Sequence, residues 1–314
     1  MVNLSLSELV AGFFVDLQLR NQTEATIKTC RWHIDRFLKF LAVKGVTIPE
    51  QITRELLREY QVDLVLTPNI RGRRNTPATV NRYMGSVAGF IRYLKRENHL
   101  PPGPEQGITY ARTGRQLPQT VLSREEMVRL IEAPDIRTVL GYRDRTIMEL
   151  LYTTAIRRNE CRLLTVCDID FTERLLRVYG KGRKERMVPI GRIALKFLEG
   201  YLVNVRPVLV MDPVEEHLFL SSKGRRMSRN VMGEFIAKYA RRAGIDKRVT
   251  PHTFRHTCAT LMLRNHADVR HIQVLLGHES LESTQIYTHV AATDLKEVLE
   301  KYHPRERDHE RAKG

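Results

Sequence analysis

Four short segments, far apart in the sequence, carry residue types that can act together on a phosphate group. The segments are 154–160, 180–186, 252–256 and 275–289. The side chains of interest are Arg157 and Glu160 in the first, Lys181 in the second, His252 and Arg255 in the third, and His278 and Tyr287 in the last. Two guanidinium groups can hold the non-bridging oxygens of a phosphate and stabilise the charge that develops there during substitution at phosphorus. Such a group of cations has little reason to form in an apolar core.

The spacing within two of these segments places their members on one face of a helix. His252 and Arg255 are three residues apart, as are Arg157 and Glu160, and residues at this spacing are neighbours on a helix. Tyr287 offers a nucleophile. The pKa of a free tyrosine is about 10, so its attack would need neighbouring cations that favour the phenolate.

Taken one at a time, each of these residues also has an ordinary structural explanation. An arginine can form a surface salt bridge, a lysine can occupy a hairpin turn, a glycine–histidine pair can end a helix, and a tyrosine can pack in a core. Those explanations would apply to Arg157 with Glu160, to Lys181, to Gly277 with His278, and to Tyr287. Only the joint order of the residues distinguishes the two interpretations.

A metal or other cofactor is not expected. His252 and His256 have the spacing of a zinc-binding helix, but Thr253 stands where a zinc protease pattern requires glutamate, and no third ligand is evident. The cysteines lack paired metal-ligand spacing and are expected to be free, buried thiols of a cytosolic protein; they are Cys30, Cys161, Cys167 and Cys258. No phosphate-binding GxxxxGK loop is present, so a need for ATP is not expected either.

The joint order Arg, Lys, His-x-x-Arg, Gly-His, Tyr closely resembles that of the tyrosine site-specific recombinases, also called the phage integrase family. The local sequences GKGRKERMVPIG and LLGHESLESTQIYTHV, and the later HPR at 303–305, resemble the XerC and XerD branch of that family. The resemblance is strong over residues 120–305 and weaker over the first domain and the linker.

This resemblance implies a mechanism and a role for each residue. Tyr287 would attack a DNA phosphate, giving a 3′-phosphotyrosyl link and a free 5′-hydroxyl. Arg157 and Arg255 would clamp the phosphate. The remaining roles would be proton transfer to the 5′-oxygen by Lys181, proton transfer from the tyrosine by His252, a hydrogen bond to a phosphate oxygen by His278, and orientation of the site by Glu160.

One departure from the family pattern lies beside the first arginine. The family usually has Thr-Gly-Leu-Arg, and this chain has Thr-Ala-Ile-Arg at 154–157. We expect a helix to tolerate Ala155, so activity is expected to be retained. The change would matter only if that position required a positive φ.

Regular elements must position these residues. A strand at 175–179, a turn at 180–183 and a returning strand at 187–190 predict a β-hairpin. Ser123 and Glu126 match a capping box ahead of a helix. The apolar periodicity predicts further helical regions at 143–164, 192–204, 228–243, 252–265, 267–276 and 293–302.

The first hundred residues are predicted to form a small helical bundle. Thr23 is a plausible N-cap for an apolar helix that runs up to Gly45, and a second helix is predicted to open at 76–77 with proline at its first position. A basic stretch precedes that second helix and contains Arg71, Arg73 and Arg74. It is either a loop that contacts DNA phosphates or a solvated surface loop.

The chain is therefore predicted to be mainly α with a small β-sheet, in two domains. The resemblance implies an N-terminal helical, SAM-like core-binding domain and a C-terminal α+β catalytic domain of the tyrosine recombinase type. The predicted boundaries are 1–108 for the DNA-binding domain, 109–120 for the linker, 121–305 for the catalytic domain and 306–314 for a charged tail.

Composition points to a polyanionic partner. The chain has 314 residues, 42% of them hydrophobic, and a net charge of +16, which favours a globular protein that binds nucleic acid, although ribosome-associated and membrane-surface proteins share the bias. Residues 1–108 carry a balance of +5 and the remainder +11, so each domain could present a positive face. No apolar run approaches a membrane span and the start does not match a signal peptide, so a cytoplasmic location is expected.

The resemblance also implies the partners. They would be double-stranded DNA with a short inverted-repeat core site and further protomers, as a homotetramer on two duplexes or a heterotetramer with a related recombinase. An apolar stripe on 293–302 could dock on a neighbouring subunit, or it could pack on its own domain. The first helix is expected too close to the start for an additional arm-site domain. Two other functions remain open, a type IB topoisomerase-like DNA relaxer and a non-catalytic DNA-binding accessory factor.

Overall fold

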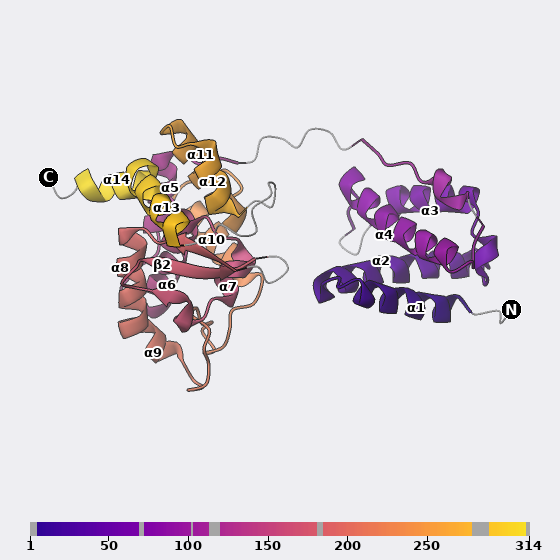
Figure 1. Cartoon of the computed structure of the whole chain (residues 1–314), viewed down its shortest axis with the longest axis horizontal. Coiled ribbons are helices and arrows are strands. Elements are labelled where there is room, and N and C mark those ends of the chain that lie inside the picture. The colour runs from indigo at the N-terminus through magenta and orange to yellow at the C-terminus, as the bar shows by residue number, and fades with distance from the viewer. Residues whose placement is uncertain are drawn as a thin grey trace. The chain divides into compact units, whose positions relative to one another are not determined.

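The computed structural model describes residues 5–68, 72–101, 103–112, 120–180, 185–277 and 289–311. The chain divides into two compact units, Met1–Leu117 and Pro118–Gly314 (Figure 1). Each unit has its own hydrophobic core. The fold is mainly α-helical with one small antiparallel sheet, which confirms the predicted fold class.

Helices form the first unit. They are α1 (Leu6–Leu19), α2 (Glu24–Val43), α3 (Arg54–Leu66) and α4 (Pro77–Arg96), with short 3₁₀ turns at Pro49–Gln51 and Pro104–Gly107. The side chain of Thr23 accepts a hydrogen bond from the Thr26 N–H at the start of α2, as the sequence predicts. Thr76 caps α4 in the same way, with Pro77 as the first helical residue. The caps therefore define where the two longest helices of the unit begin.

The start of the predicted linker belongs to the first unit. The Asn81 side chain exchanges hydrogen bonds with the backbone of Ala111, at 2.8 and 3.0 Å, and Gln61 donates to the carbonyl of Thr109. Gly107 lies so close to α3 that a Cβ there would stand 2.6 Å from the carbonyl oxygen of Arg54. The prediction of a linker from residue 109 is therefore wrong for 109–111. Glycines and prolines in this stretch permit close packing as well as chain flexibility, and their count alone does not distinguish the two.

The second unit combines a three-stranded sheet with helices. Before the sheet come α5 (Arg124–Glu132), α6 (Val139–Thr154), α7 (Arg158–Leu163) and a 3₁₀ turn (Val166–Asp168). The sheet consists of β1 (Ile169–Asp170), β2 (Leu175–Tyr179) and β3 (Glu185–Pro189), in that order and antiparallel. After it come α8 (Arg192–Gly200), a π-helical turn (Tyr201–Val205), α9 (Arg206–Leu209), α10 (Val231–Arg242), α11 (Pro251–Arg264), α12 (Val269–Leu276), α13 (His289–Tyr302) and α14 (Pro304–Arg311).

The hairpin of β2 and β3 agrees with the sequence prediction. Leu175 pairs with Pro189 at one end and Tyr179 with Glu185 at the other. The strand β1 pairs with the start of β2 and was not predicted, because two residues are too short for a periodic signal. The capping box of Ser123 on α5 is present as expected.

A sharp break divides the region that the sequence predicts as helical from 143 to 164. Helix α6 ends at Thr154, and Ala155 takes a left-handed conformation with φ +50° and ψ +24°. The chain then re-enters helix at Arg158, with Arg157 as the N-cap of α7. The expectation that helix geometry accommodates Ala155 is therefore wrong, because this position requires the positive φ that glycine adopts without strain.

The C-terminal segment packs on its own unit. Leu295 and Leu299 are 5% and 2% exposed, and α13 lies against strand β3 while α14 lies against α8 (Figure 1). Leu295 and Leu299 of the apolar stripe on 293–302 are thus buried within their own unit, as expected if the stripe packs on its own domain. Residues 306–311 are helical and not a tail, and the side chain of Glu306 is buried.

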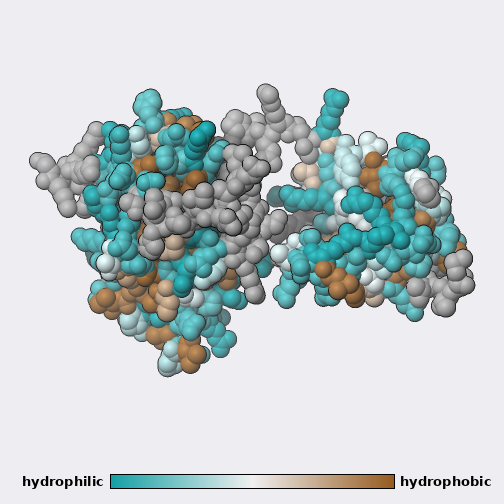
Figure 2. Space-filling view, viewed as in Figure 1, coloured by the Kyte–Doolittle hydropathy of each residue, from teal (hydrophilic) through white to brown (hydrophobic). Residues whose placement is uncertain are grey.

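On the face shown in Figure 2, hydrophilic residues predominate on each unit, and smaller hydrophobic areas are scattered among them. In the second unit, exposed apolar side chains gather along the chain around α9, where Val203, Val208, Met211 and Val214 are each more than two-thirds exposed. Among the described helices, none is long and apolar enough to cross a membrane.

Candidate active site

The helix break at Ala155 places Arg157 at the centre of the site. As N-cap of α7, Arg157 donates its backbone N–H to Glu160 Oε2 at 2.8 Å and its Nη1 to Glu160 Oε1 at 2.9 Å. Its Nη2 donates to the carbonyl oxygen of Gly277 at 3.2 Å. The side chain is 40% exposed, so the guanidinium is anchored on one side and accessible on the other.

Glu160 is held by two arginines. It accepts from Arg157 and also from Arg186 on β3, whose Nη1 and Nη2 lie 3.1 and 2.8 Å from the two carboxylate oxygens. Burial by itself would raise the pKa of this carboxyl group, but hydrogen bonds and charge from Arg186 and then Arg157 hold the pKa below its usual value. Glu160 is therefore ionised, and it fixes the orientation of Arg157.

Arg255 approaches the same point from α11. Its Nη1 donates to the carbonyl of Ala155 at 2.7 Å, and its Nη2 donates to the carbonyl of Leu276. Burial, followed by the positive charge of Arg157, lowers its pKa to about 10. Arg255 therefore stays protonated at neutral pH. Because Arg157 is also positively charged, the two side chains together would strongly attract an anion placed between them.

The end of α12 supplies acceptors to both arginines. The carbonyl oxygen of Leu276 accepts a hydrogen bond from Arg255, and that of Gly277 accepts one from Arg157. Gly277 has a left-handed backbone conformation with φ +60°. A side chain at Gly277 would not fit, since a Cβ would stand 2.9 Å from Nε of Arg186. The carbonyls thus bring the two guanidinium groups together directly beside the backbone that leads into His278.

His252 lies on the same helix as Arg255, one turn nearer its start. Burial lowers its pKa, and the charges of Arg158, Arg255 and Arg157 lower it further. The imidazole is consequently neutral at pH 7 and can accept a proton. This is the protonation state that a residue assisting the ionisation of a tyrosine requires.

The described part of the site carries an excess of positive charge. Arg157, Arg186 and Arg255 contribute three cations, and Glu160 contributes one carboxylate. Each guanidinium has five N–H groups, and the hydrogen bonds of Arg157 and Arg255 described above use two side-chain N–H groups in each. The remaining donors suit a phosphate, which offers several acceptor oxygens and a negative charge.

Of the predicted site residues, the structure brings together Arg157, Glu160, His252 and Arg255. Three others, Lys181, His278 and Tyr287, lie outside the described residues, as does Arg71 of the basic loop. The chain segments on either side of them are described: Lys181 lies between β2 and β3, and both His278 and Tyr287 lie between α12 and α13. Arg73 and Arg74 are exposed and precede the N-cap of α4.

Arg186 is a site residue that the sequence reasoning did not single out. It stands one residue after the exposed Glu185 and two before the buried Val188, so it points to the same inward face of β3 as the core valine. A charged residue on the buried face of a strand requires a partner, and this could have marked it. What the sequence could not identify was the partner, because Glu160 lies 26 residues away.

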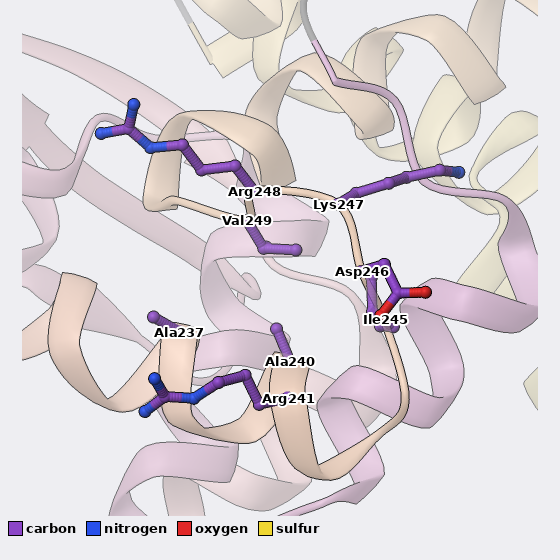
Figure 3. A pocket seen from close by; sticks show the side chains of 8 residues that line it. All are labelled: Ala237, Ala240, Arg241, Ile245, Asp246, Lys247, Arg248 and Val249. Atoms are coloured by element: carbon purple, nitrogen blue, oxygen red, sulfur yellow. The ribbon is translucent and has the colours of Figure 1, made fainter.

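A separate hollow of about 350 Å³ lies between the end of α10 and the segment leading to α11. Figure 3 shows its alkyl side chains, among them Ala237, Ala240 and Val249, with Arg241 and Arg248 directed to one side and Lys247 to the other. It contains none of the predicted site residues. Lys247 is engaged by Glu126 at 2.7 Å. Within the described ranges, no three His, Cys, Asp or Glu side chains are grouped so that they could hold a metal ion.

The sequence of this chain is similar to those of known proteins over most of its length. The model of the phage integrase family matches residues 120–294. The chain is 32% identical over 292 residues to a tyrosine recombinase XerD of Staphylococcus haemolyticus, which covers 93% of this chain and 96% of that protein. It is 35% identical over 308 residues to a tyrosine recombinase XerC 2 of Ralstonia nicotianae, which covers 97% of this chain and 88% of that protein.

Solved structures show the same fold at lower identity. A lambda integrase dimer bound to a COC′ core site has a TM-score of 0.67 and 17% identity, over 90% of this chain and all of that one. The XerH recombinase bound to a palindromic difH substrate has a TM-score of 0.63 and 23% identity, over 90% of this chain and 81% of that one.

Proposed function

Because the chain belongs to the phage integrase family and is related over almost its whole length to tyrosine recombinases, we propose that it cuts and rejoins DNA at a specific site through a 3′-phosphotyrosyl intermediate. The single observation that carries this proposal is the convergence of Arg157 and Arg255 on the carbonyls of 276–277, immediately before the segment that holds His278 and Tyr287. Arg157 and Arg255 together form a cationic clamp, and the segment that contains Tyr287 follows the clamp carbonyls in the sequence.

In the proposed step, the phenolate oxygen of Tyr287 attacks the phosphorus of the scissile phosphodiester. A bond forms between that oxygen and phosphorus, and the bond to the 5′-oxygen breaks. Neutral His252 takes the tyrosine proton, consistent with its lowered pKa. Lys181, on the turn between β2 and β3, gives a proton to the departing 5′-oxygen.

The arginines stabilise the transition state. Arg157 and Arg255 bind the non-bridging oxygens, on which negative charge accumulates as phosphorus becomes five-coordinate, and His278 donates a further hydrogen bond. Their anchors are fixed before substrate arrives, since Glu160 holds Arg157 and backbone carbonyls hold Arg255. Preorganised donors avoid the free-energy cost of reorienting dipoles during the reaction.

The phosphotyrosyl link stores the energy of the broken phosphodiester. A 5′-hydroxyl of a second duplex can attack it and restore a phosphodiester, with release of the tyrosine. Each exchange conserves the number of high-energy links, so the proposed cycle proceeds by transesterification with neither ATP nor a metal as a reactant. The cations that other phosphoryl transfer enzymes obtain from Mg²⁺ are here side chains of the protein.

We propose that the first unit is a core-site DNA-binding domain, with Arg71, Arg73 and Arg74 contacting phosphates, and that the second unit is the catalytic domain. The substrate would be double-stranded DNA with a short inverted-repeat core site, in the cytoplasm. Four copies, or two copies with two of a related recombinase, would hold two duplexes; one similar solved structure is a lambda integrase tetramer bound to a Holliday junction. The biological role would be chromosome or plasmid dimer resolution, with chromosome partition, or integration and excision of a mobile element.

Two alternatives predict different behaviour. A type IB topoisomerase-like relaxer would share the clamp and the tyrosine but would form adducts with little sequence preference. A non-catalytic accessory factor would bind DNA without forming any adduct. The near full-length similarity to tyrosine recombinases favours recombination over both.

The test is covalent trapping on nicked duplexes from the genomic surroundings of the gene. We expect the wild-type protein to form complexes that survive denaturation at one short inverted repeat, and Tyr287→Phe to bind the same DNA without forming them. Tyr179→Phe is the matched control, since Tyr179 is a half-exposed tyrosine of the same unit. Adducts that persist in Tyr287→Phe would show that the nucleophile is wrong, and scattered adducts would favour the relaxer.

A further inference from the structure

Five arginines are buried in the described part of the chain, and one of them has no acidic partner there. Four form ion pairs: Arg143 with Asp144, Arg145 and Arg305 with Glu149, and Arg186 with Glu160. The fifth, Arg162 on α7, is 9% exposed. Buried charges in proteins are normally paired, because an unpaired charge loses its hydration without compensation.

The contacts of Arg162 do not neutralise it. Its Nε and Nη2 both donate to the amide oxygen of Asn159, at 3.2 and 3.1 Å. An amide oxygen is an acceptor without net charge, so these two N–H groups have an acceptor but the positive charge has no counter-charge in this contact.

Further arginines surround Arg162. Arg158 stands one helical turn earlier on the same face of α7, a spacing at which like charges repel. Arg226 and Arg229 come from the loop before α10, and burial together with the charges of Arg226, Arg229 and Arg158 lowers the pKa of Arg162. The free protein thus holds four like charges together, an arrangement that a bound polyanion would stabilise.

This group adjoins the clamp. Arg157 is the N-cap of α7, and Arg162 follows five residues later. At 1.5 Å of rise per residue this is about 7.5 Å along the helix axis, similar to the rise of about two nucleotides along one strand of B-DNA. A strand whose scissile phosphate lies at Arg157 and that runs along α7 would present a neighbouring phosphate to the arginines of this helix.

We infer that Arg158, Arg162, Arg226 and Arg229 form a second phosphate-binding site, which takes a backbone phosphate of the same DNA strand next to the one that is cleaved. The inference rests on the proposed function and adds to it a contact that positions the strand without reading its sequence. The site acts on binding, and the chemical step stays with the clamp.

The first experiment measures the salt dependence of DNA binding by the full-length protein. Each phosphate contact contributes a slope of about −0.9 in a plot of log binding constant against log salt concentration. We expect Arg162→Gln to reduce the magnitude of the slope by about 0.9 on a duplex of about 30 base pairs, and to weaken binding about 10- to 100-fold at moderate salt. The loss of cleavage in Arg162→Gln should be largest at low DNA concentration and should become smaller as the DNA concentration rises.

Two control variants distinguish this site from general charge and from folding. Arg137→Gln removes an exposed arginine paired with Asp135 and should leave the slope unchanged. Arg143→Gln removes a buried arginine with a carboxylate partner and should lower the melting temperature, whereas Arg162→Gln should leave it unchanged or raise it. If Arg162→Gln fails to fold, the salt dependence of binding is measured for Arg226→Gln and Arg229→Gln, which change exposed arginines. The same reduction in slope is expected.

A second experiment identifies the phosphate. Single phosphates near the cleavage position are replaced by neutral methylphosphonates. One replacement should weaken wild-type binding but cause no further loss in Arg162→Gln, because the variant no longer uses that contact. Losses that add fully at every position would overturn the inference.

The remaining outcomes are also decisive. If Tyr287-dependent adducts form and all variants keep the wild-type slope, the second site is wrong and the proposed function stands. If the wild-type protein neither binds duplex DNA nor forms adducts, both are wrong. If Arg162→Gln instead abolishes self-association without DNA and keeps the slope, the anion is an acidic side chain of another copy, and the DNA inference is overturned.

Discussion

At the scale of single residues, Arg186 connects parts of the site that are distant in sequence. It holds both oxygens of Glu160, which in turn holds Arg157, and its guanidinium lies against Gly277 at the end of α12. It also belongs to the strand that follows the turn with Lys181. Arg186 is a positioning residue in this arrangement, since its contacts are with other site residues.

Arg186→Met is therefore expected to reduce cleavage by misplacing Arg157, and to destabilise the protein by about 2 kcal/mol through the loss of a buried partner of Glu160. A substrate with a methylphosphonate at the scissile position lacks the single negative charge that Arg157 binds, so Arg186→Met should cleave it with a much smaller defect. The measurement is the ratio of cleavage rates on the two substrates, with melting temperature recorded in parallel.

Arg186→Lys provides the comparison for this prediction, since it keeps the charge and loses the two-pronged geometry. We expect it to recover stability more fully than cleavage. An equal loss on both substrates for Arg186→Met would indicate a structural role alone.

At the scale of elements, the break between α6 and α7 determines the positions of Arg157 and Arg255. The left-handed conformation of Ala155 turns the chain, and the carbonyl oxygen of Ala155 accepts a hydrogen bond from Arg255. Arg157, two residues later, is then the N-cap of α7. A non-glycine residue in this conformation costs about 1–2 kcal/mol. Ala155 keeps this strained conformation because the packing of α6 and α7 and the hydrogen bond from Arg255 hold it there.

Ala155→Gly should raise the free energy of unfolding by about 0.5–1 kcal/mol, since glycine adopts the positive φ without strain. Activity should be retained, because the carbonyl that receives Arg255 belongs to the backbone. The matched control is Ala194→Gly, a buried alanine inside α8, which should be destabilising by about 1 kcal/mol. Chemical denaturation measures both, and a destabilised Ala155→Gly would contradict the strain assigned to this residue.

The C-terminal helices are joined to the core by a buried histidine. His303 contacts the Tyr152 carbonyl through Nε2 at 3.2 Å, and its Nδ1 accepts the Arg305 N–H at 3.1 Å, so Nε2 carries the proton and the ring is neutral. Burial lowers the pKa of His303 to about 4. Because the unfolded chain binds this proton near pH 6.5 and the folded chain only near 4, the contribution of His303 to stability is complete above about pH 6.5 and is lost as pH falls toward 4.

The shift corresponds to about 3 kcal/mol. Glu306 acts in the opposite direction in part of this window, since burial raises its pKa and its protonation stabilises the fold as pH falls. Comparing wild type with His303→Gln isolates the histidine: the variant should lose less stability than wild type between pH 7 and pH 4.5. Equal losses in denaturation experiments at the two pH values would contradict the assignment.

At the scale of the whole molecule, the last two helices are structural parts of the second unit. Leu295 and Leu299 are buried, and Lys296 and Glu300 pair with Glu173 and Arg174 near the sheet. Removing residues 289–314 should therefore expose the core of the second unit and leave that of the first intact. Hydrogen exchange should show loss of protection in β3 and α8 and unchanged protection in α2 and α4. Unchanged protection throughout would mean that α13 is dispensable for the fold.

Several features could be predicted from sequence. The order and types of the clamp residues indicated the family. Local patterns indicated the β-hairpin and the helix starts at Thr23, Thr76 and Ser123. These features depend on periodicity and on caps only three residues long, so neighbouring residues are sufficient to specify them. The roles of Lys181 and Tyr287 remain predictions from the resemblance.

Tertiary structure alone decided the partners of the buried charges and the conformations that other elements impose. The pairing of Arg186 with Glu160, the lack of an acidic partner for Arg162 among the described residues, the left-handed Ala155 and the burial of the C-terminal stripe each depend on segments distant in sequence. The sequence by itself determined which cations are available and in what order. Which cation is neutralised internally and which is left for an anion depends on burial, because desolvation makes an unpaired charge costly only where the fold has removed water.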